Sequence, residues 1–196
     1  EFRRVLFRSV LLLAALAEGE TVVEALLDSD DTQVMRSAIK SLGVELVDEG
    51  EALRVVGCGG RFRTLQADIF VGNSGLSIRT LVPAIVASLA GCGDPDALVR
   101  LAGVPRMHER PIGDLVDGLT QLGAVVEWLG QPGYPPLALK PAELSADRIS
   151  VRGNVSSQFL TGLLQAAPLV ARERPLTIDV EGELISRPYV EITLNL

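Results

Sequence analysis

The chain has 196 residues, a formal net charge of −7 and only 4% aromatic residues. This composition argues against a nucleic-acid-binding protein, because such proteins use basic faces and aromatic stacking platforms. The longest apolar run, residues 81–90, is interrupted by Pro83 and is shorter than the roughly 20 residues that a membrane span needs. With 47% hydrophobic residues, the chain can bury a sizeable core, and we expect a globular α/β protein without a membrane span.

The two cysteines, Cys58 and Cys92, are not spaced as metal ligands, and the single histidine cannot complete a zinc site with them. We therefore expect no metal and no cofactor. Cysteine usage of this kind is typical of a reduced, cytoplasmic protein.

The first nine residues, EFRRVLFRS, differ in kind from the sequence that follows. They have neither the apolar core nor the cleavage site of a signal peptide. Glu-Phe is encoded by a common cloning site, and RVLFRS can be back-translated into the end of a sequencing adapter. We predict that residues 1–9 are a non-native scar and that the protein's own sequence occupies residues 10–196.

Hydrophobic periodicity predicts a unit that begins near Val10 and repeats along the chain. In the first unit we expect a helix over 10–17, a strand over 21–27, a helix over 29–42, and strands over 43–47 and 52–56.

The second unit has the same order, with a helix over 74–89, a strand over 97–102, a helix over 110–122, and strands over 124–128 and 137–140. The turn "LTQLGAVVEWL" in this unit is similar to "IKSLGVELV" in the first. Three units of this kind imply an α/β domain in which helices share an interior and strands form outer sheets.

The third unit begins with a strand over 148–151, followed by a helix over 156–170, a strand over 175–180 and a helix over 187–196. The pattern stops there, before the two strands that close the earlier units. We therefore expect a third repeat that is truncated.

Two predicted helices begin after a Gly-Asn turn at matching repeat positions, in "GNSGLSIR" from Gly72 and in "GNVSSQF" from Gly153. A helix N-terminus offers free backbone N–H groups and the positive end of the dipole to an anion. The alternative is simple N-capping by Asn or Ser, which is the commoner role of these residues. Two matching sites, one with Arg79 a turn inside the helix, favour recognition of phosphate or carboxylate.

In "RMHERPIGDL", Arg110 precedes Pro111, a residue that suits the first turn of a helix. A guanidinium on a stiff loop is suited to bidentate contact with carboxylate or phosphate, although a solvated charged loop is the alternative. His108 in this loop is a candidate general acid or base, but nothing nearby in the sequence orients it.

In "ISRPYVEIT", Ser186, Arg187 and Tyr189 stand around Pro188 at the start of another predicted helix. Capping by Ser186 is the structural alternative here. The repeat pattern puts Arg187 at a position equivalent to that of Arg110, which favours one shared binding site.

Six segments together resemble the 5-enolpyruvylshikimate-3-phosphate synthase (3-phosphoshikimate 1-carboxyvinyltransferase) family: "LLLAALAEGET", "LDSDDTQVM", "GNSG", "RMHERPIGDLVDGLTQLGA", "GNVSSQFLTGLLQAAPL" and "ISRPYVEITLNL". The resemblance implies an enzyme that transfers the enolpyruvyl group of phosphoenolpyruvate to the 5-hydroxyl of shikimate 3-phosphate and releases phosphate. It also implies a fold of two similar domains, each built from three βαβαββ-like units, of which this chain supplies one domain.

The resemblance assigns roles to individual residues. For shikimate 3-phosphate it implies Ser156, Ser157 and Gln158, assisted by Ser186 and Tyr189. For phosphoenolpyruvate it implies Gly75 and Arg110, with Asn73 and Arg79 in the same loop but with less direct involvement. Both substrates carry several negative charges, so an acidic chain has to bind them through focused donors of this kind.

The sequence departs from the family pattern in three respects. Where the family has a Gly-Ser-Lys-Ser segment ending in Arg, this chain has the predicted scar, with Arg8 one position away from the expected arginine, so that role is not transferred. Leu76 stands where the family usually has Thr. The other domain, with the acid and base carboxylates, has no counterpart in these 196 residues, so we expect a substrate-binding domain incomplete at both ends, inactive alone and monomeric when complete.

Two alternatives remain open at this point. One is the enolpyruvyl transferase that acts on UDP-N-acetylglucosamine and shares the repeat fold; Ser-Ser-Gln and the Arg-Pro-Ile-Gly-Asp-Leu run favour the shikimate enzyme. The other is a noncatalytic module that only binds a ligand or partner.

Overall fold

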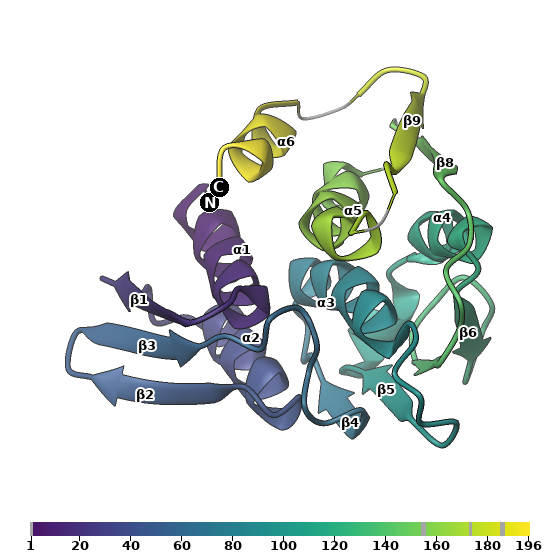
Figure 1. Ribbon diagram of the computed structural model, residues 1–196. Coiled ribbons are helices and arrows are strands. Elements are labelled where there is room, and N and C mark those ends of the chain that lie inside the picture. Colours follow the sequence, from purple (N-terminus) through teal and green to yellow (C-terminus); the bar gives the residue numbers. More distant parts are fainter. Residues whose placement is uncertain (1, 154–155, 173, 185–186) are drawn as a thin grey trace.

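A computed structural model describes residues 2–153, 156–172, 174–184 and 187–196 (Figure 1). The helices are α1 (Phe2–Leu16), α2 (Asp30–Ser41), α3 (Gly75–Leu89), α4 (Gly113–Leu122), α5 (Ser157–Val170) and α6 (Arg187–Leu194), with a 3-10 helix η1 (Pro105–Glu109). The strands are β1 (Glu20–Glu24), β2 (Glu45–Glu49), β3 (Ala52–Val56), β4 (Gln66–Phe70), β5 (Leu98–Ala102), β6 (Val125–Trp128), β7 (Leu137–Lys140), β8 (Arg148–Arg152) and β9 (Thr177–Glu181).

The strands form separate sheets that repeat one pairing scheme. The first has the order β1-β3-β2 with antiparallel neighbours, and the second has the order β4-β5-β7-β6. The segment β5-β7-β6 of the second sheet has the same antiparallel order as β1-β3-β2. Strand β4 adds to β5 in parallel, just as β8 pairs in parallel with β9 in the third unit. The two larger sheets therefore share one antiparallel strand order, and the α/β class expected from the sequence is present.

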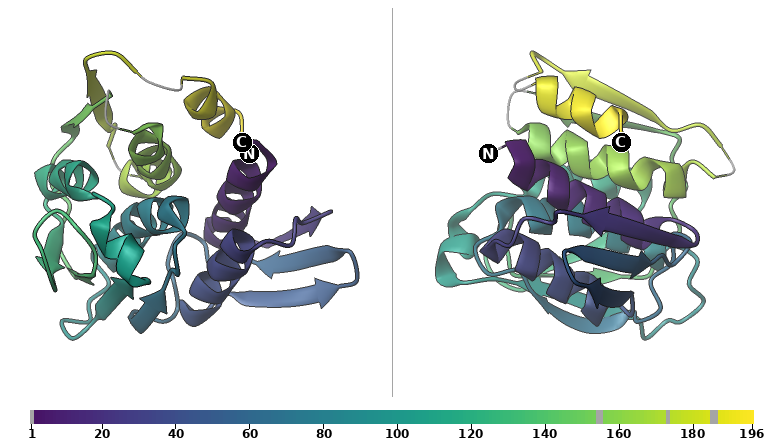
Figure 2. Two further views of the ribbon diagram at one scale, coloured as in Figure 1. Left: turned by 180° about the vertical axis from the view of Figure 1, so that it is seen from behind. Right: turned by 90° about the vertical axis from the view of Figure 1, so that its left-hand side faces the viewer.

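The sheets lie at the periphery, and α1, α3 and α5 lie between them (Figure 1). Helix α3 packs against both α1 and α5, and α5 packs in turn against α6, as the two views of Figure 2 also show. Every residue of α3 except Ala87 is buried. A helix that is apolar on nearly all sides is typical of the centre of a fold, and α3 occupies that place.

The close approach of α3 and α5 depends on one glycine. A Cβ atom at Gly162 of α5 would stand 2.2 Å from the carbonyl oxygen of Arg79 on α3. Only a residue without a side chain lets these two backbones come so near. This contact fixes how the first turns of the two helices lie relative to each other.

One predicted element has a wrong start, and one observed strand was not predicted. The helix expected over 110–122 begins only at Gly113, because Arg110 is extended (φ −98°, ψ 116°) ahead of Pro111, and a residue before proline avoids helical geometry. Strand β4 was not predicted: Ile69 is its one buried residue, and the apolar Phe70 is 61% exposed. The strand is stabilised by its parallel pairing with β5.

Other differences concern boundaries. Strand β1 ends at Glu24 where Ala25 has a positive φ of 51°, so the expected strand over 21–27 is cut short. Helix α1 begins at Phe2, and the residues predicted to be a scar are thus part of a helix.

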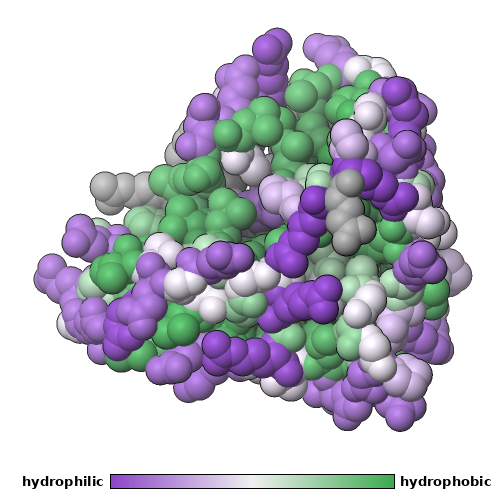
Figure 3. Space-filling model, viewed as in Figure 1, coloured by the Kyte–Doolittle hydropathy of each residue, from purple (hydrophilic) through white to green (hydrophobic). Residues whose placement is uncertain are grey.

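No helix within the described ranges is long and apolar enough to cross a membrane. Figure 3 shows apolar side chains reaching the surface in the upper part of the view, over α6, where Leu194 and Leu196 are 65% and 51% exposed.

Candidate functional site

The N-terminus of α3 has no side-chain cap from its N-cap residue. Ser74 holds the N-cap position, but its side chain makes no capping hydrogen bond. Its hydroxyl is instead 2.7 Å from that of Ser77, one turn along the helix. The backbone N–H groups of the first turn therefore have no capping partner from Ser74, and the positive end of the helix dipole lies at the same place.

Arg110 lies directly over this helix start. A Cβ at Gly75 would stand 2.5 Å from the Cζ atom of Arg110, so the absence of a side chain at Gly75 makes room for the guanidinium. Arg110 Nη1 donates to the carbonyl oxygen of Asn73 at 3.0 Å, across a sequence separation of 37 residues. The structure thus brings together three of the predicted site residues, Asn73, Gly75 and Arg110.

Arg79 joins the same area to α5. Its Nη1 donates to Gln158 Oε1 at 2.6 Å, its Nη2 donates to the carbonyl oxygen of Pro111 at 2.9 Å, and its Cζ lies 5.2 Å from the centroid of the Phe159 ring. The side chain is largely buried, with 9% of the residue exposed. Burial, and to a lesser degree the nearby charge of Arg110, lower the pKa of Arg79 to about 10, so the group stays protonated at neutral pH.

The N-terminus of α5 differs from that of α3, because Ser156 caps it. The Ser156 hydroxyl accepts from the backbone N–H of Gln158 at 3.2 Å, which is the capping role expected of a serine at this position. Ser156, Ser157 and Gln158 are all half-buried, so their polar atoms remain within reach of a ligand. Capping by one serine leaves the neighbouring Ser157 hydroxyl for other partners.

The positive charge at this place is not compensated within the described part of the chain. No ion pair there involves Arg79 or Arg110. A buried charge without a counter-ion costs free energy, and an anionic ligand would remove that cost. The arrangement is therefore suited to phosphate or carboxylate.

Arg8 also reaches this area, and sequence reasoning gave it no role. Its Nη1 lies 2.5 Å from Asp31 Oδ2 on α2 and 3.4 Å from the Ser74 hydroxyl, and 7% of the residue is exposed. The carboxylate neutralises this guanidinium, in contrast to those of Arg79 and Arg110. The only sequence signal was an arginine one position from the family's expected place.

Two open pockets border the start of α3. One, of about 510 Å³, is lined by Asn73, Arg106, Glu109 and Arg110. The other, of about 680 Å³, lies on the opposite side of Asn73, against the acidic start of α2 from Asp28 to Asp31. The first is the basic one, and we regard it as the anion-binding side.

Three further residues singled out from the sequence are Tyr189, Ser186 and Leu76. Tyr189 lies in the first turn of α6, which packs on α5 through a contact of 3.5 Å between the hydroxyls of Thr193 and Thr161. Ser186 lies outside the described residues. Leu76 is 3% exposed and faces the interior.

His108 is in η1, and its Nε2 atom is buried without a hydrogen-bond partner in the described structure. It does not line the basic pocket beside Arg110. The hypothesis that His108 acts as an acid or base gains no support from this position.

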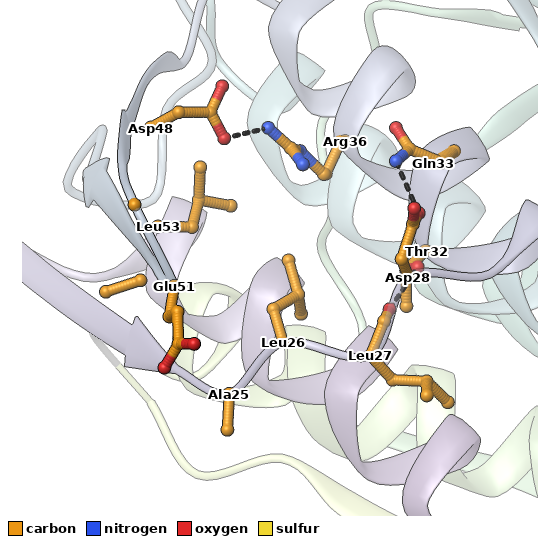
Figure 4. Close-up of a pocket in the computed structure, with 12 residues that line it drawn as sticks. Ala25, Leu26, Leu27, Asp28, Thr32, Gln33, Arg36, Asp48, Glu51 and Leu53 are labelled. Atoms are coloured by element: carbon orange, nitrogen blue, oxygen red, sulfur yellow. Dashed lines mark hydrogen bonds and ion pairs between the residues drawn. The ribbon is translucent and has the colours of Figure 1, made fainter.

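A further pocket, of about 540 Å³, lies between the β1–α2 loop and the β2–β3 hairpin (Figure 4). Its polar side chains pair with one another: Arg36 with Asp48 at 2.5 Å, and Gln33 with Asp28 at 2.6 Å. It contains none of the predicted site residues, and its cation is already neutralised. The chemistry therefore points to the start of α3 instead.

In the described segments, no group of three or more His, Cys, Asp or Glu side chains could hold a metal ion.

Comparison with known proteins identifies the family that the chain matches. The sequence model of the EPSP synthase family (3-phosphoshikimate 1-carboxyvinyltransferase) matches residues 8–196. The chain is 59% identical over 189 residues to the 3-phosphoshikimate 1-carboxyvinyltransferase of Ralstonia pickettii, covering 95% of this chain and 42% of the relative. It is 57% identical over 190 residues to that of Bordetella petrii, covering 95% of this chain and 41% of the relative. The chain thus spans less than half the length of these relatives.

Solved structures share the fold. An EPSP synthase from Acinetobacter baumannii superposes with a TM-score of 0.77 at 20% identity, over 95% of this chain and 40% of the other. The enolpyruvyl transferase NikO from Streptomyces tendae gives a TM-score of 0.57 at 16% identity, over 98% of this chain and 41% of the other. Since the family's sequence model covers nearly the whole sequence, the chain belongs to the EPSP synthase family.

Proposed function

We propose that this chain binds the substrates of an enolpyruvyl transfer, in which the enolpyruvyl group of phosphoenolpyruvate passes to the 5-hydroxyl of shikimate 3-phosphate and phosphate is released. The observation that carries the proposal is the pair of guanidiniums, Arg79 and Arg110, that lie without an ion-pair partner in the described structure beside the uncapped start of α3. The printed names of the relatives give the substrate class.

Phosphoenolpyruvate fits the side of the site formed by Gly75, Asn73 and Arg110. A guanidinium with two parallel N–H groups suits a phosphate or carboxylate, and the α3 N–H groups add donors aimed at the same place. Preorganised donors of this kind stabilise charge that develops during transfer.

Shikimate 3-phosphate fits the start of α5. Its proposed contacts are Ser156, Ser157 and Gln158, with Ser186 and Tyr189 assisting. The hydroxyl and amide groups match a ligand that carries several hydroxyls and a phosphate.

We further propose that residues 10–196 belong to one domain of the enolpyruvyl transferase fold, built on βαβαββ-like repeats. The acid and base carboxylates would then come from a second domain. By itself the chain is expected to bind shikimate 3-phosphate weakly and to show no turnover. The complete enzyme would be monomeric and cytoplasmic.

Calorimetric titration of the 196-residue chain tests the binding. We expect a response to shikimate 3-phosphate and to phosphoenolpyruvate, and none to UDP-N-acetylglucosamine. Arg110→Lys should weaken phosphoenolpyruvate binding about tenfold, because lysine cannot reproduce the two parallel N–H donors of a guanidinium. Arg100→Lys, at an exposed ion pair with Asp68, is the matched control. Binding of the UDP-sugar alone would overturn the assignment.

A noncatalytic module is the second candidate, because donors such as Arg110 over the start of α3 can bind an anion without catalysing its transfer. A chimera separates the two: residues 10–196 replace the matching segment of that relative, and phosphate release is measured with both substrates. Turnover in the chimera supports the enzyme, and binding without turnover supports the module.

A further inference from the structure

The guanidinium of Arg79 connects three segments that are far apart in the sequence. It extends from α3 to Gln158, 79 residues away, and to the Pro111 carbonyl, 32 residues away. Gln158 belongs to the proposed shikimate 3-phosphate side, and Pro111 directly follows Arg110 on the proposed phosphoenolpyruvate side. One side chain thus bonds to both sides of the candidate site.

The surroundings of Arg79 suit a fixed connector. Both terminal nitrogens already donate to protein oxygens, the Phe159 ring lies beneath the guanidinium, and only 9% of the residue is exposed. The backbone of Arg79 is held as well, because Gly162 lets α5 approach its carbonyl oxygen. Arg110, by contrast, is half-buried and lines the open pocket, where a ligand can reach it.

We infer that Arg79 is a positioning residue: its two hydrogen bonds hold the start of α5 and the Arg110 loop in one fixed relation, so that the two substrate sides form together. This inference rests on the proposed function for the identity of the ligands, but the geometry that it describes exists without them. A planar guanidinium can donate from two nitrogens in two set directions, whereas a lysine ammonium is a point donor on a flexible stem.

The charge of Arg79 has a second effect in this arrangement. Arg110 is close enough to lower the pKa of Arg79, so the two cations repel each other. The bond to the Pro111 carbonyl opposes that repulsion, since it ties the backbone next to Arg110 to Arg79 itself. An anion between the two sides would relieve the repulsion and strengthen the connection.

A measurement without ligand tests the positioning role. In the labelled 196-residue chain, Gln158→Ala should shift the side-chain N–H signal of Arg110, because the change is passed on through Arg79. In an Arg79→Lys background the same Gln158→Ala change should leave that signal within error. In an Arg100→Lys background the shift should persist, as Arg100 lies on β5 in an exposed ion pair. A shift of Arg110 that survives Arg79→Lys would overturn the inference.

A binding measurement then tests the consequence. Arg79→Lys should weaken shikimate 3-phosphate and phosphoenolpyruvate together, each about tenfold, as expected for loss of charge-assisted bonds. Arg110→Lys should weaken only phosphoenolpyruvate. Gln158→Ala should weaken shikimate 3-phosphate most and phosphoenolpyruvate to a smaller degree, because it removes one of the two bonds of Arg79. If Arg79→Lys binds both ligands as the unchanged chain does, its charge alone is sufficient and the positioning role is wrong. If the unchanged chain binds neither ligand, the proposed function fails, and the Arg110 signal still decides the role of Arg79.

Discussion

Helices α3 and α5 both begin shortly after a Gly-Asn pair in the sequence, yet their N-cap serines have different hydrogen-bond partners. Ser156 caps α5 by accepting from the backbone N–H of Gln158, whereas Ser74 makes no capping bond and directs its hydroxyl to Ser77. Arg110 lies over the uncapped helix, at Gly75.

This difference shows that similar sequences at a helix start do not have the same function. "GNSG" and "GNVSS" both suggest a cap or an anion site, but Arg110 lies over the start of α3, which has no cap from Ser74. The guanidinium of Arg79 bonds instead to Gln158, beside the capped start of α5. The peptide at each helix start allows a cap or an anion site, and the positions of the neighbouring arginine side chains distinguish the two. The following predictions test this contrast, from the largest expected effect to the smallest.

Gly162→Ala should disrupt the close packing of α3 against α5, which sets how the two helix starts lie relative to each other. Its Cβ would meet the carbonyl oxygen of Arg79 at 2.2 Å, and a helix backbone cannot yield as a side chain can. We expect a loss of about 3 kcal/mol in the free energy of unfolding, measured by urea denaturation. Gly118→Ala in α4 is the matched control: its Cβ would meet side-chain atoms, Val151 Cγ1 at 3.0 Å and Leu163 Cδ1 at 3.9 Å, instead of backbone, and its cost should be smaller. Equal costs would mean that α3 and α5 are not held this closely.

Gly75→Ala should separate binding from stability. The new Cβ would displace the Arg110 guanidinium, which can move because it is the end of a long side chain. We expect phosphoenolpyruvate affinity to fall at least about tenfold by calorimetry, with a change in stability of less than about 1 kcal/mol. Gly113, the first residue of α4, offers a matched control, and Gly113→Ala should leave the affinity unchanged. Retained affinity in Gly75→Ala would place the anion elsewhere.

Ser156→Ala should lower the free energy of unfolding by about 1 kcal/mol, because it removes the cap of α5. Ser157→Ala, one residue further along, should cost less, since Ser157 does not hold the N-cap position. Urea denaturation of both variants checks the difference. If the two costs are equal, the cap does not stabilise α5.

The titration of Arg79 gives the smallest effect. Burial and the Arg110 charge lower its pKa to about 10, so its charge is complete below that pH and is lost as the pH rises through it. The charged form is the disfavoured one in the fold, so its cost to stability is present below about pH 10 and is relieved above it. Inorganic phosphate should raise this pKa, because a nearby anion favours the charged form. The pKa is measured from the NMR resonance of the Arg79 Cζ carbon.

Arg110→Gln is the control for that titration. Removing the repelling charge should raise the pKa of Arg79 even without phosphate, since Arg110 is one of the causes of the shift. A pKa that responds to neither phosphate nor Arg110→Gln would contradict a shared anion site.

The repeated pattern let the sequence predict most helices and strands. The apolar run that became α3 was interpreted correctly, because burial leaves a local trace in the sequence. Capping at the serine before α5 was the alternative considered beside ligand binding, and the structure has the cap. Strand β4 left no such trace, as three of its five residues are exposed and its stability comes from pairing with β5. The loop at Arg110 was interpreted as helix because proline suits a first turn, although the residue before proline resists one.

The sequence by itself determined the order of the elements, the apolar helix at the centre and the residue types that can bind an anion. Only the tertiary structure decided which of them act together: that Arg110 lies over Gly75, that Arg79 reaches both Gln158 and Pro111, and that Arg8 is neutralised by Asp31. Periodicity describes contacts between neighbours in the chain. The partners of these arginines are fixed by the packing of helices and loops from different repeats, and no spacing within one segment encodes that packing.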